Sequence, residues 1–146
     1  MEHDNQFKFE TTIYVRFGDM DAMGHVNNAK YLTYFEQARV EYFRLLFGRG
    51  VESSMDQSFI IAEIRIRFLA SAKEGDQLKV MARVSRFGSK SFDFEYHIVN
   101  KVTGVLVCDG SSVQVMYDYI SQSTIPLPKE FIQRVQDFEG YSIKTS

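Results

Sequence analysis

The chain has no tryptophan, one cysteine and two prolines among its 146 residues, and its net charge of −2 is nearly balanced. The single cysteine, Cys108, excludes an internal disulfide and supplies no zinc-ligand spacing. The balanced charge gives no basic field for nucleic acid or an anionic membrane. No hydrophobic run approaches the length of a membrane span, and the N-terminus is polar where a signal peptide is basic and then apolar. We therefore expect a soluble cytoplasmic protein with no nucleic-acid or membrane partner and no metal.

The composition suits one ordinary globular domain. Hydrophobic residues make up 45% of the chain and aromatic residues 14%, which is enough to bury a core at this length. No linker, internal repeat or low-complexity tract divides the sequence. We expect a single domain over residues 1–146, with a flexible tail over residues 1–6.

Two periodicities follow one another in the first third of the chain. Apolar and polar side chains alternate over residues 7–17, which predicts a strand. The pattern breaks at Gly18 and resumes after Asn28 with a spacing of three and four, which predicts a helix ending near Gly48 or Gly50. Because apolar side chains lie on more than one side of this helix, we expect it to run through the middle of the protein with a sheet around it.

The rest of the chain predicts four more strands after a loop over residues 51–57. Alternation recurs in four runs, at residues 63–68, 78–85, 92–98 and 113–117. The links between these runs are short, and short links join antiparallel neighbours. Pro128 suits the first turn of a short terminal helix. The expected fold class is therefore α+β, with a five-stranded antiparallel sheet wrapped around a long central helix and a short C-terminal helix.

Residues 16–31 hold most of the groups that can do chemistry. Asp21 can act as a general base on water or as a nucleophile, and it can equally stabilise a turn of its own loop. His25 can donate a proton or orient a carbonyl, or it can simply bond to backbone. If Asn27 or Asn28 caps the helix that follows, the first free N–H groups of that helix face this loop and can stabilise an oxyanion.

Nearby residues have simpler expected roles. We expect Gly24 to adopt a positive φ or to let a ligand approach the backbone closely. Asp19 could share a metal with Asp21, but no further carboxylate follows at a liganding interval, so a turn-stabilising or helix-entry role is expected. On the helix, Glu36 and Arg39 are spaced to pair across one turn.

The loop and the helix after it carry a diagnostic motif. Residues 16–28 contain Arg-Phe-x-Asp-x-Asp-x-x-Gly-His-Val-Asn-Asn, and Tyr-x-x-Tyr-Phe-Glu-x-Ala-Arg follows over residues 31–39. This stretch resembles the hotdog-fold acyl-CoA thioesterases of the 4-hydroxybenzoyl-CoA thioesterase type, and the likeness spans almost the whole chain. The resemblance implies the hotdog fold, in which a sheet wraps around a central helix.

The resemblance also implies a reaction. Members of this family hydrolyse an acyl-CoA thioester, aliphatic or aryl, to a free acid and coenzyme A, and they need no metal or redox cofactor. Their catalytic carboxylate falls on Asp21. The plant acyl-carrier-protein thioesterases are similar in this loop, with their catalytic Asp and His on Asp21 and His25. The asparagine that they place in between falls on Met23, so their full mechanism is not carried over.

Self-association and substrate contacts are implied in the same way. Related hotdog enzymes place the site between two subunits, so a dimer or a homotetramer built as a dimer of dimers is expected. Two N-terminal sheet edges can pair to form a longer sheet. The family places coenzyme A contacts near the strand start after Gly88. Together with the loop, this gives the candidate substrate-binding residues Gly24, Asn28, Tyr31, Arg86, Ser89, Lys90 and Ser91.

Three functions are compatible with these residues. The first is an acyl-CoA thioesterase that uses Asp21. The second is a module that binds an acyl thioester without cleaving it, and the third is an acyl-carrier-protein thioesterase or a hydratase on the same fold. Release of free thiol from acyl-CoA, compared between the wild type and Asp21→Asn, distinguishes cleavage from binding.

Overall fold

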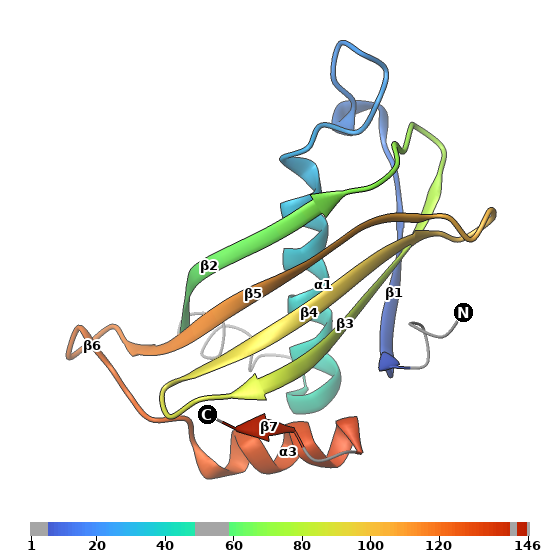
Figure 1. Cartoon of the computed structure of the whole chain (residues 1–146). Coiled ribbons are helices and arrows are strands. Elements are labelled where there is room, and N and C mark those ends of the chain that lie inside the picture. The colour runs from blue at the N-terminus through green and yellow to red at the C-terminus, as the bar shows by residue number, and fades with distance from the viewer. Residues whose placement is uncertain (1–5, 49–58, 141–142, 146) are drawn as a thin grey trace.

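The computed structural model describes residues 6–48, 59–140 and 143–145. Five long strands form one antiparallel sheet in the order β1-β3-β4-β5-β2 (Figure 1). These strands are β1 (Phe9–Tyr14), β2 (Phe59–Phe68), β3 (Gln77–Phe87), β4 (Ser91–Asn100) and β5 (Leu106–Asp118). Two short strands extend the pairing: β6 (Ser123–Thr124) pairs with β5, and β7 (Lys144–Thr145) pairs in parallel with β3. The loop predicted over residues 51–57 and most of the predicted tail lie outside the described residues.

The long helix α1 (Lys30–Phe47) crosses one face of this sheet (Figure 1). It ends at Gly48, whose φ of 86° lies in the region that favours glycine and whose N–H bonds to the Arg44 carbonyl at 2.8 Å. The prediction of a long, largely buried helix ending near Gly48 is therefore confirmed. Leu32 and Leu45 nevertheless stay exposed, because the described chain covers only one side of the helix. No helix among the described residues is both long and apolar enough to span a membrane.

Aromatic side chains fill the space between α1 and the sheet. Phe35 stacks on Tyr96 of β4 with ring centroids 4.1 Å apart, and Phe43 packs against Phe59 at 5.5 Å. The strand predictions rest on the same alternation, and every second residue of β4 from Phe92 to Ile98 is buried. Burial of these large side chains is the main driving force that holds the helix on the sheet.

A second helix, α3 (Lys129–Glu139), packs near the far end of α1 (Figure 1). The predicted terminal helix is confirmed, with Pro128 at the N-cap position just before its first turn, and Phe131 and Val135 are buried. Gly140 ends the helix in the left-handed region, with φ 74°. The burial of Glu139 at the last turn is a feature that the sequence pattern does not predict.

The N-terminal strand is shorter than its alternation predicts. β1 ends at Tyr14, and Phe17, which the pattern placed in the strand, is 81% exposed at the start of the short 3-10 helix η2 (Phe17–Asp19). The prediction of a strand through Phe17 is therefore wrong. The physical reason is a local hydrogen bond: the Asp19 carboxylate accepts the Arg16 N–H at 3.1 Å and turns the chain.

Candidate active site

The Asp21 loop, defined as residues 20–26, is fixed at its base. Met20 and Val26 form an isolated antiparallel bridge, and the buried Val26 donates its N–H to the Ala72 carbonyl at 2.8 Å. Within the loop, the Asp21 N–H donates to the His25 carbonyl at 2.8 Å. Gly24 has φ 83°, so the predicted positive φ is confirmed, and it allows the tight return of the chain. The loop therefore presents its exposed residues from a defined backbone.

The two oxygens of the Asp21 carboxylate differ in their hydrogen bonds. Its Oδ1 accepts the N–H groups of Met23 at 2.9 Å and His25 at 3.4 Å, which is the turn-stabilising arrangement that the sequence left open. Its Oδ2 makes no hydrogen bond with any described residue. The side chain is exposed. One oxygen thus orients the carboxylate while the other is available to water or substrate.

A groove of about 300 Å³ opens beside this carboxylate. On one side it is lined by Asp21 and His25 of the loop and by Asn28 and Tyr31 at the start of α1. The other side is formed by the end of β2 and the segment after it, through Phe68, Leu69, Ala70 and Ser71. The structure therefore brings four of the predicted site residues to one concave surface.

The start of α1 differs from the predicted cap. Neither asparagine is the N-cap, which is Ala29. Instead, Asn27 Oδ1 accepts the Ala29 N–H at 2.9 Å, and the Asn27 carbonyl accepts the Lys30 N–H at 2.8 Å. The reason is that an asparagine side chain bonds readily to the N–H two residues ahead, which forms a turn before the helix begins. The Asn28 N–H makes no hydrogen bond with any described residue, so it is a free backbone donor of a residue that lines the groove.

Asp19 stabilises the segment around the loop through hydrogen bonds and does not line the groove. The carboxylate is only 2% exposed and accepts the Tyr34 hydroxyl at 2.8 Å and the Arg16 N–H at 3.1 Å. Burial opposes ionisation, but these hydrogen bonds and the Arg16 charge outweigh it and hold the pKa of Asp19 below its usual value. Its carbonyl also accepts the Asn27 N–H at 2.9 Å. The expected role in turn and helix entry is confirmed.

Tyr31 forms part of the groove wall from the first turn of α1. The residue is buried, and its ring lies 5.7 Å from the Phe68 ring across the groove and 5.7 Å from the Tyr34 ring beside it. Burial raises the pKa of the Tyr31 hydroxyl to about 12, so this group is neutral at physiological pH. It can offer a hydrogen bond to a ligand, and it brings no charge to the groove.

The four remaining predicted contacts, Arg86, Ser89, Lys90 and Ser91, lie at the turn between β3 and β4. This turn is at the opposite end of the sheet from the Asp21 loop (Figure 1). Arg86 is already paired with Asp93 at 2.8 Å and bonded to Ser91 Oγ at 3.0 Å, and Lys90 Nζ lies 3.3 Å from Thr124 Oγ1. One chain alone therefore does not bring these residues to the groove.

The predicted pair on α1 is not formed. Arg39 donates from Nη1 to the Tyr96 hydroxyl at 3.1 Å and is only 7% exposed, whereas Glu36 is exposed. Glu36 makes no hydrogen bond or ion pair within the described part of the chain. The prediction is wrong because Arg39 turns toward β4 and the core, away from the side chain one turn earlier.

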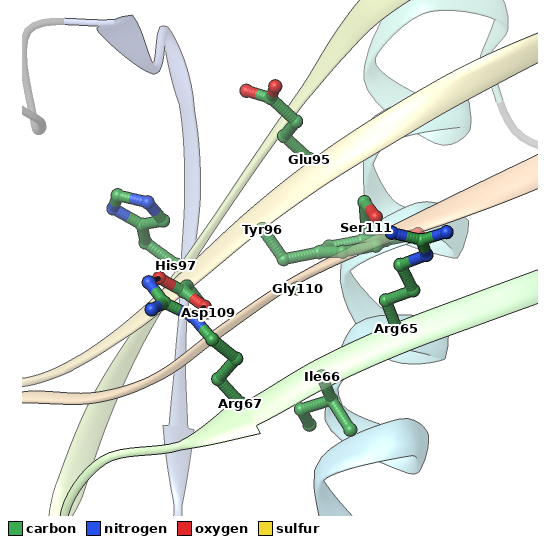
Figure 2. Close-up of a pocket in the computed structure, with 9 residues that line it drawn as sticks. All are labelled: Arg65, Ile66, Arg67, Glu95, Tyr96, His97, Asp109, Gly110 and Ser111. Atoms are coloured by element: carbon green, nitrogen blue, oxygen red, sulfur yellow. Dashed lines mark hydrogen bonds and ion pairs between the residues drawn. The ribbon is translucent and has the colours of Figure 1, made fainter.

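A second hollow of about 350 Å³ lies on the outer face of the sheet (Figure 2). Its charged residues come from β2, β4 and β5, and the sticks in Figure 2 show Arg67 and Asp109 meeting across two strands. That pair is bidentate, with distances of 2.9 and 2.6 Å. Both carboxylates that line this hollow are held in ion pairs, Asp109 with Arg67 and Glu95 with Arg83, whereas Asp21 Oδ2 makes no hydrogen bond with any described residue.

The sequence analysis missed the far wall of the groove. Residues 68–71 are the last residue of β2 and the segment after it, and nothing in their spacing connects them to the Asp21 loop. Only the pairing of Val26 with Ala72, which joins segments far apart in the chain, places them there. No group of three or more His, Cys, Asp or Glu side chains among the described residues is arranged to hold a metal ion.

Known proteins resemble this chain along most of its length. The acyl-CoA thioesterase YbgC of Haemophilus influenzae is 30% identical over 130 residues, covering 87% of this chain and 92% of that protein. The long-chain acyl-CoA thioesterase FadM of Escherichia coli K12 is 25% identical over 127 residues, covering 87% of this chain and 96% of that protein. A thioesterase of Thermus thermophilus, solved in complex with coenzyme A and Zn, superposes with a TM-score of 0.84 at 29% identity.

That structure covers 94% of this chain and 98% of its own. The family model described as the thioesterase-like superfamily matches residues 15–135, which include the Asp21 loop, the whole of α1 and the four long strands β2 to β5. By fold, by the loop that carries Asp21 and by this match, the chain belongs to the thioesterase-like superfamily.

Proposed function

We propose that the protein hydrolyses acyl-CoA thioesters to a free acid and coenzyme A in the groove beside Asp21. The observation that carries the proposal is the free Asp21 Oδ2 on the same concave surface as His25 and the free Asn28 N–H. Carboxylate, imidazole and an oriented amide are the groups that attack on a thioester carbonyl requires. The acyl-CoA thioesterase names of the relatives support the substrate class.

The proposed chemistry needs only these groups and water. Asp21 takes a proton from water as the water oxygen attacks the carbonyl carbon, or attacks that carbon directly to form an anhydride that water then hydrolyses. The Asn28 N–H stabilises the negative charge that develops on the carbonyl oxygen. The carbon–sulfur bond breaks when the tetrahedral intermediate collapses, which in the direct-attack route is the step that forms the anhydride, before its hydrolysis. The thiol of coenzyme A leaves with a proton for which His25 is the nearby donor. No resident cofactor is proposed.

We also propose that the functional unit is a homodimer or a dimer of dimers. The end of β2 forms one wall of the groove, and the predicted contacts Arg86 and Lys90 lie at the opposite end of the sheet within one chain. The sequence analysis assigned self-association to the N-terminal edge, which is β1. The structure favours the other edge, because β2 carries the exposed apolar side chains Ile60, Ile61 and Phe68.

The buried single Cys108 fits the cytoplasm, which stays the expected compartment.

A non-catalytic binding module is the alternative, and one observation favours it. Asp21 Oδ1 is engaged with two loop N–H groups, so the residue has a structural role even without chemistry. The test uses acyl-CoA substrates of short, medium and long chain and with aryl groups, and follows free thiol release. Asp21→Asn keeps an oxygen for the Met23 N–H but removes the base.

The proposal predicts that Asp21→Asn lowers kcat by about 10²–10⁴-fold while the melting temperature stays unchanged. Asp118→Asn is the matched control, because Asp118 Oδ1 accepts the Ile120 N–H at 2.9 Å in the same type of turn, away from the groove. Unchanged thiol release in Asp21→Asn removes Asp21 from the mechanism. Binding of acyl-CoA without thiol release in the wild type favours the binding module.

A further inference from the structure

The far wall of the Asp21 groove carries a polar side chain that the proposed chemistry does not yet use. Phe68, Leu69 and Ala70 bring apolar side chains to this wall, and Ser71 brings a hydroxyl. Ser71 is exposed, and its hydroxyl makes no hydrogen bond with any described residue. A serine hydroxyl has one hydrogen to donate, so this group is able to bind an acceptor atom of a ligand in the groove.

The backbone is fixed on both sides of Ser71. Before it, the N–H groups of residues 69–70 both donate to the Val107 carbonyl of β5, at 2.9 and 3.0 Å. After it, the carbonyl of the buried Ala72 accepts the Val26 N–H at 2.8 Å. Ser71 therefore has a defined position in the groove, although its side chain contributes nothing to holding the wall in place.

The same contacts place Ser71 opposite the start of α1. Val26, which bonds to the residue after Ser71, stands just before Asn28 in the chain. Beyond Asn28, the Tyr31 ring lies 5.7 Å from the Phe68 ring and joins the two walls a second time. Asn28 and Ser71 line the same groove of about 300 Å³. The Asn28 N–H and the Ser71 hydroxyl thus belong to facing walls that are tied together on both sides of Asn28.

This arrangement suits the oxygen of a thioester carbonyl. Preorganised donors, among them backbone N–H groups and serine hydroxyls, stabilise the negative charge that develops on this oxygen in the transition state. We propose that the Ser71 hydroxyl is a second donor to that oxygen, across the groove from the Asn28 N–H. The hydroxyl keeps its proton and forms no bond with the acyl group. The inference rests on the proposed hydrolase function and adds a catalytic residue from outside the Asp21 motif.

Turnover tests the donor first. Ser71→Ala removes the hydroxyl and is expected to lower kcat about 10²-fold with KM nearly unchanged, because the donor acts on charge that develops after binding. Ser71→Thr keeps a hydroxyl on the same carbon and is expected to retain most of the wild-type kcat. Ser111→Ala is the matched control, since Ser111 lines the hollow on the outer face of the sheet, and it is expected to leave kcat unchanged.

Two non-hydrolysable analogues of acyl-CoA test the contact without turnover. In the ketone analogue a methylene replaces the sulfur, so the carbonyl remains, whereas in the thioether analogue a methylene replaces the carbonyl. Ser71→Ala is expected to raise the Kd of the ketone analogue about two- to tenfold, as loss of one neutral hydrogen bond does. It is expected to leave the Kd of the thioether analogue unchanged. Calorimetric titration measures both constants, and thermal unfolding checks that the variant folds.

The outcomes distinguish this inference from the proposed function. An unchanged kcat in Ser71→Ala overturns the inference while the hydrolase proposal stands. An equal rise in the Kd of both analogues also overturns it, because Ser71 then shapes the groove and does not contact the carbonyl oxygen. A wild type that binds the ketone analogue but releases no thiol from acyl-CoA refutes the hydrolase proposal. A loss of affinity in Ser71→Ala for the ketone analogue alone supports the contact in either case.

Discussion

The buried carboxylate of Glu139 makes a measurable prediction about stability. Glu139 Oε2 accepts the Tyr42 hydroxyl at 2.7 Å and the Val84 N–H at 3.1 Å, whereas Oε1 is buried with no hydrogen-bond partner. Burial raises the pKa of Glu139 above its ordinary value near 4.5, and these two hydrogen bonds and the charges of Arg83 and Lys8 offset only part of that effect.

The sign of the pH dependence follows from that raised pKa. Below about pH 4.5 the side chain is neutral in both the folded and the unfolded chain, so folding carries no ionisation penalty. As the pH rises, the unfolded chain ionises first, and the free energy of unfolding falls until the pH passes the raised pKa of the folded state. Glu139→Gln cannot ionise. Relative to the wild type, its free energy of unfolding should rise between pH 4.5 and 8, by about 1.4 kcal/mol for each unit by which burial raises the pKa of Glu139.

Urea denaturation at several pH values between 4.5 and 8 measures this difference. Glu130→Gln is the matched control, because Glu130 lies in the first turn of the same helix and its weak contact with Arg134, at 3.4 Å, is exposed to solvent. The control should follow the wild type at every pH. If the free energy of unfolding depends on pH equally in the wild type and in Glu139→Gln, burial does not raise the pKa of Glu139.

Other substitutions test the supports of the groove. Tyr34→Phe removes the 2.8 Å bond to Asp19 and should cost about 1–3 kcal/mol in urea unfolding. Because the pKa of Asp19 is lowered, its stabilisation is present above about pH 3.8 and is lost as the pH falls below it, and Tyr34→Phe should reduce this acid-side loss. Gly24→Ala should cost about 1–2 kcal/mol, since φ is 83° while a Cβ meets no atom, and an equal melting temperature would contradict this. Gly110→Ala should cost about 1–3 kcal/mol, because its Cβ would lie 2.5 Å from the Arg65 carbonyl oxygen, and calorimetry measures the loss.

The sequence predicted the helix and the sheet from side-chain periodicity. Alternation over β4 and the three-and-four spacing over α1 both depend on which face of an element is buried, and burial follows directly from hydrophobicity. The prediction failed at Phe17, where alternation continues but the local hydrogen bond of Asp19 turns the chain. Local polar bonds of this kind are not visible in a hydrophobic pattern.

The candidate site was only half visible in the sequence. Asp21, His25 and Asn28 stand close together in the chain, so a motif can show them. The opposite wall, residues 68–71, and the separation of Arg86 from the groove depend on how distant strands pair. Glu36 and Arg39 of α1 are spaced correctly for an ion pair, yet the Arg39 guanidinium donates to the Tyr96 hydroxyl on β4 instead.

By itself, the sequence determined the order of elements, the family and the loop that bears the acid, because periodicity and a contiguous motif need no knowledge of distant contacts. The tertiary structure alone decided which carboxylate oxygen is free, which N–H remains unpaired and which sheet edge is uncovered. Those features depend on hydrogen bonds and burial between segments far apart in the chain, and such contacts exist only once the chain has folded.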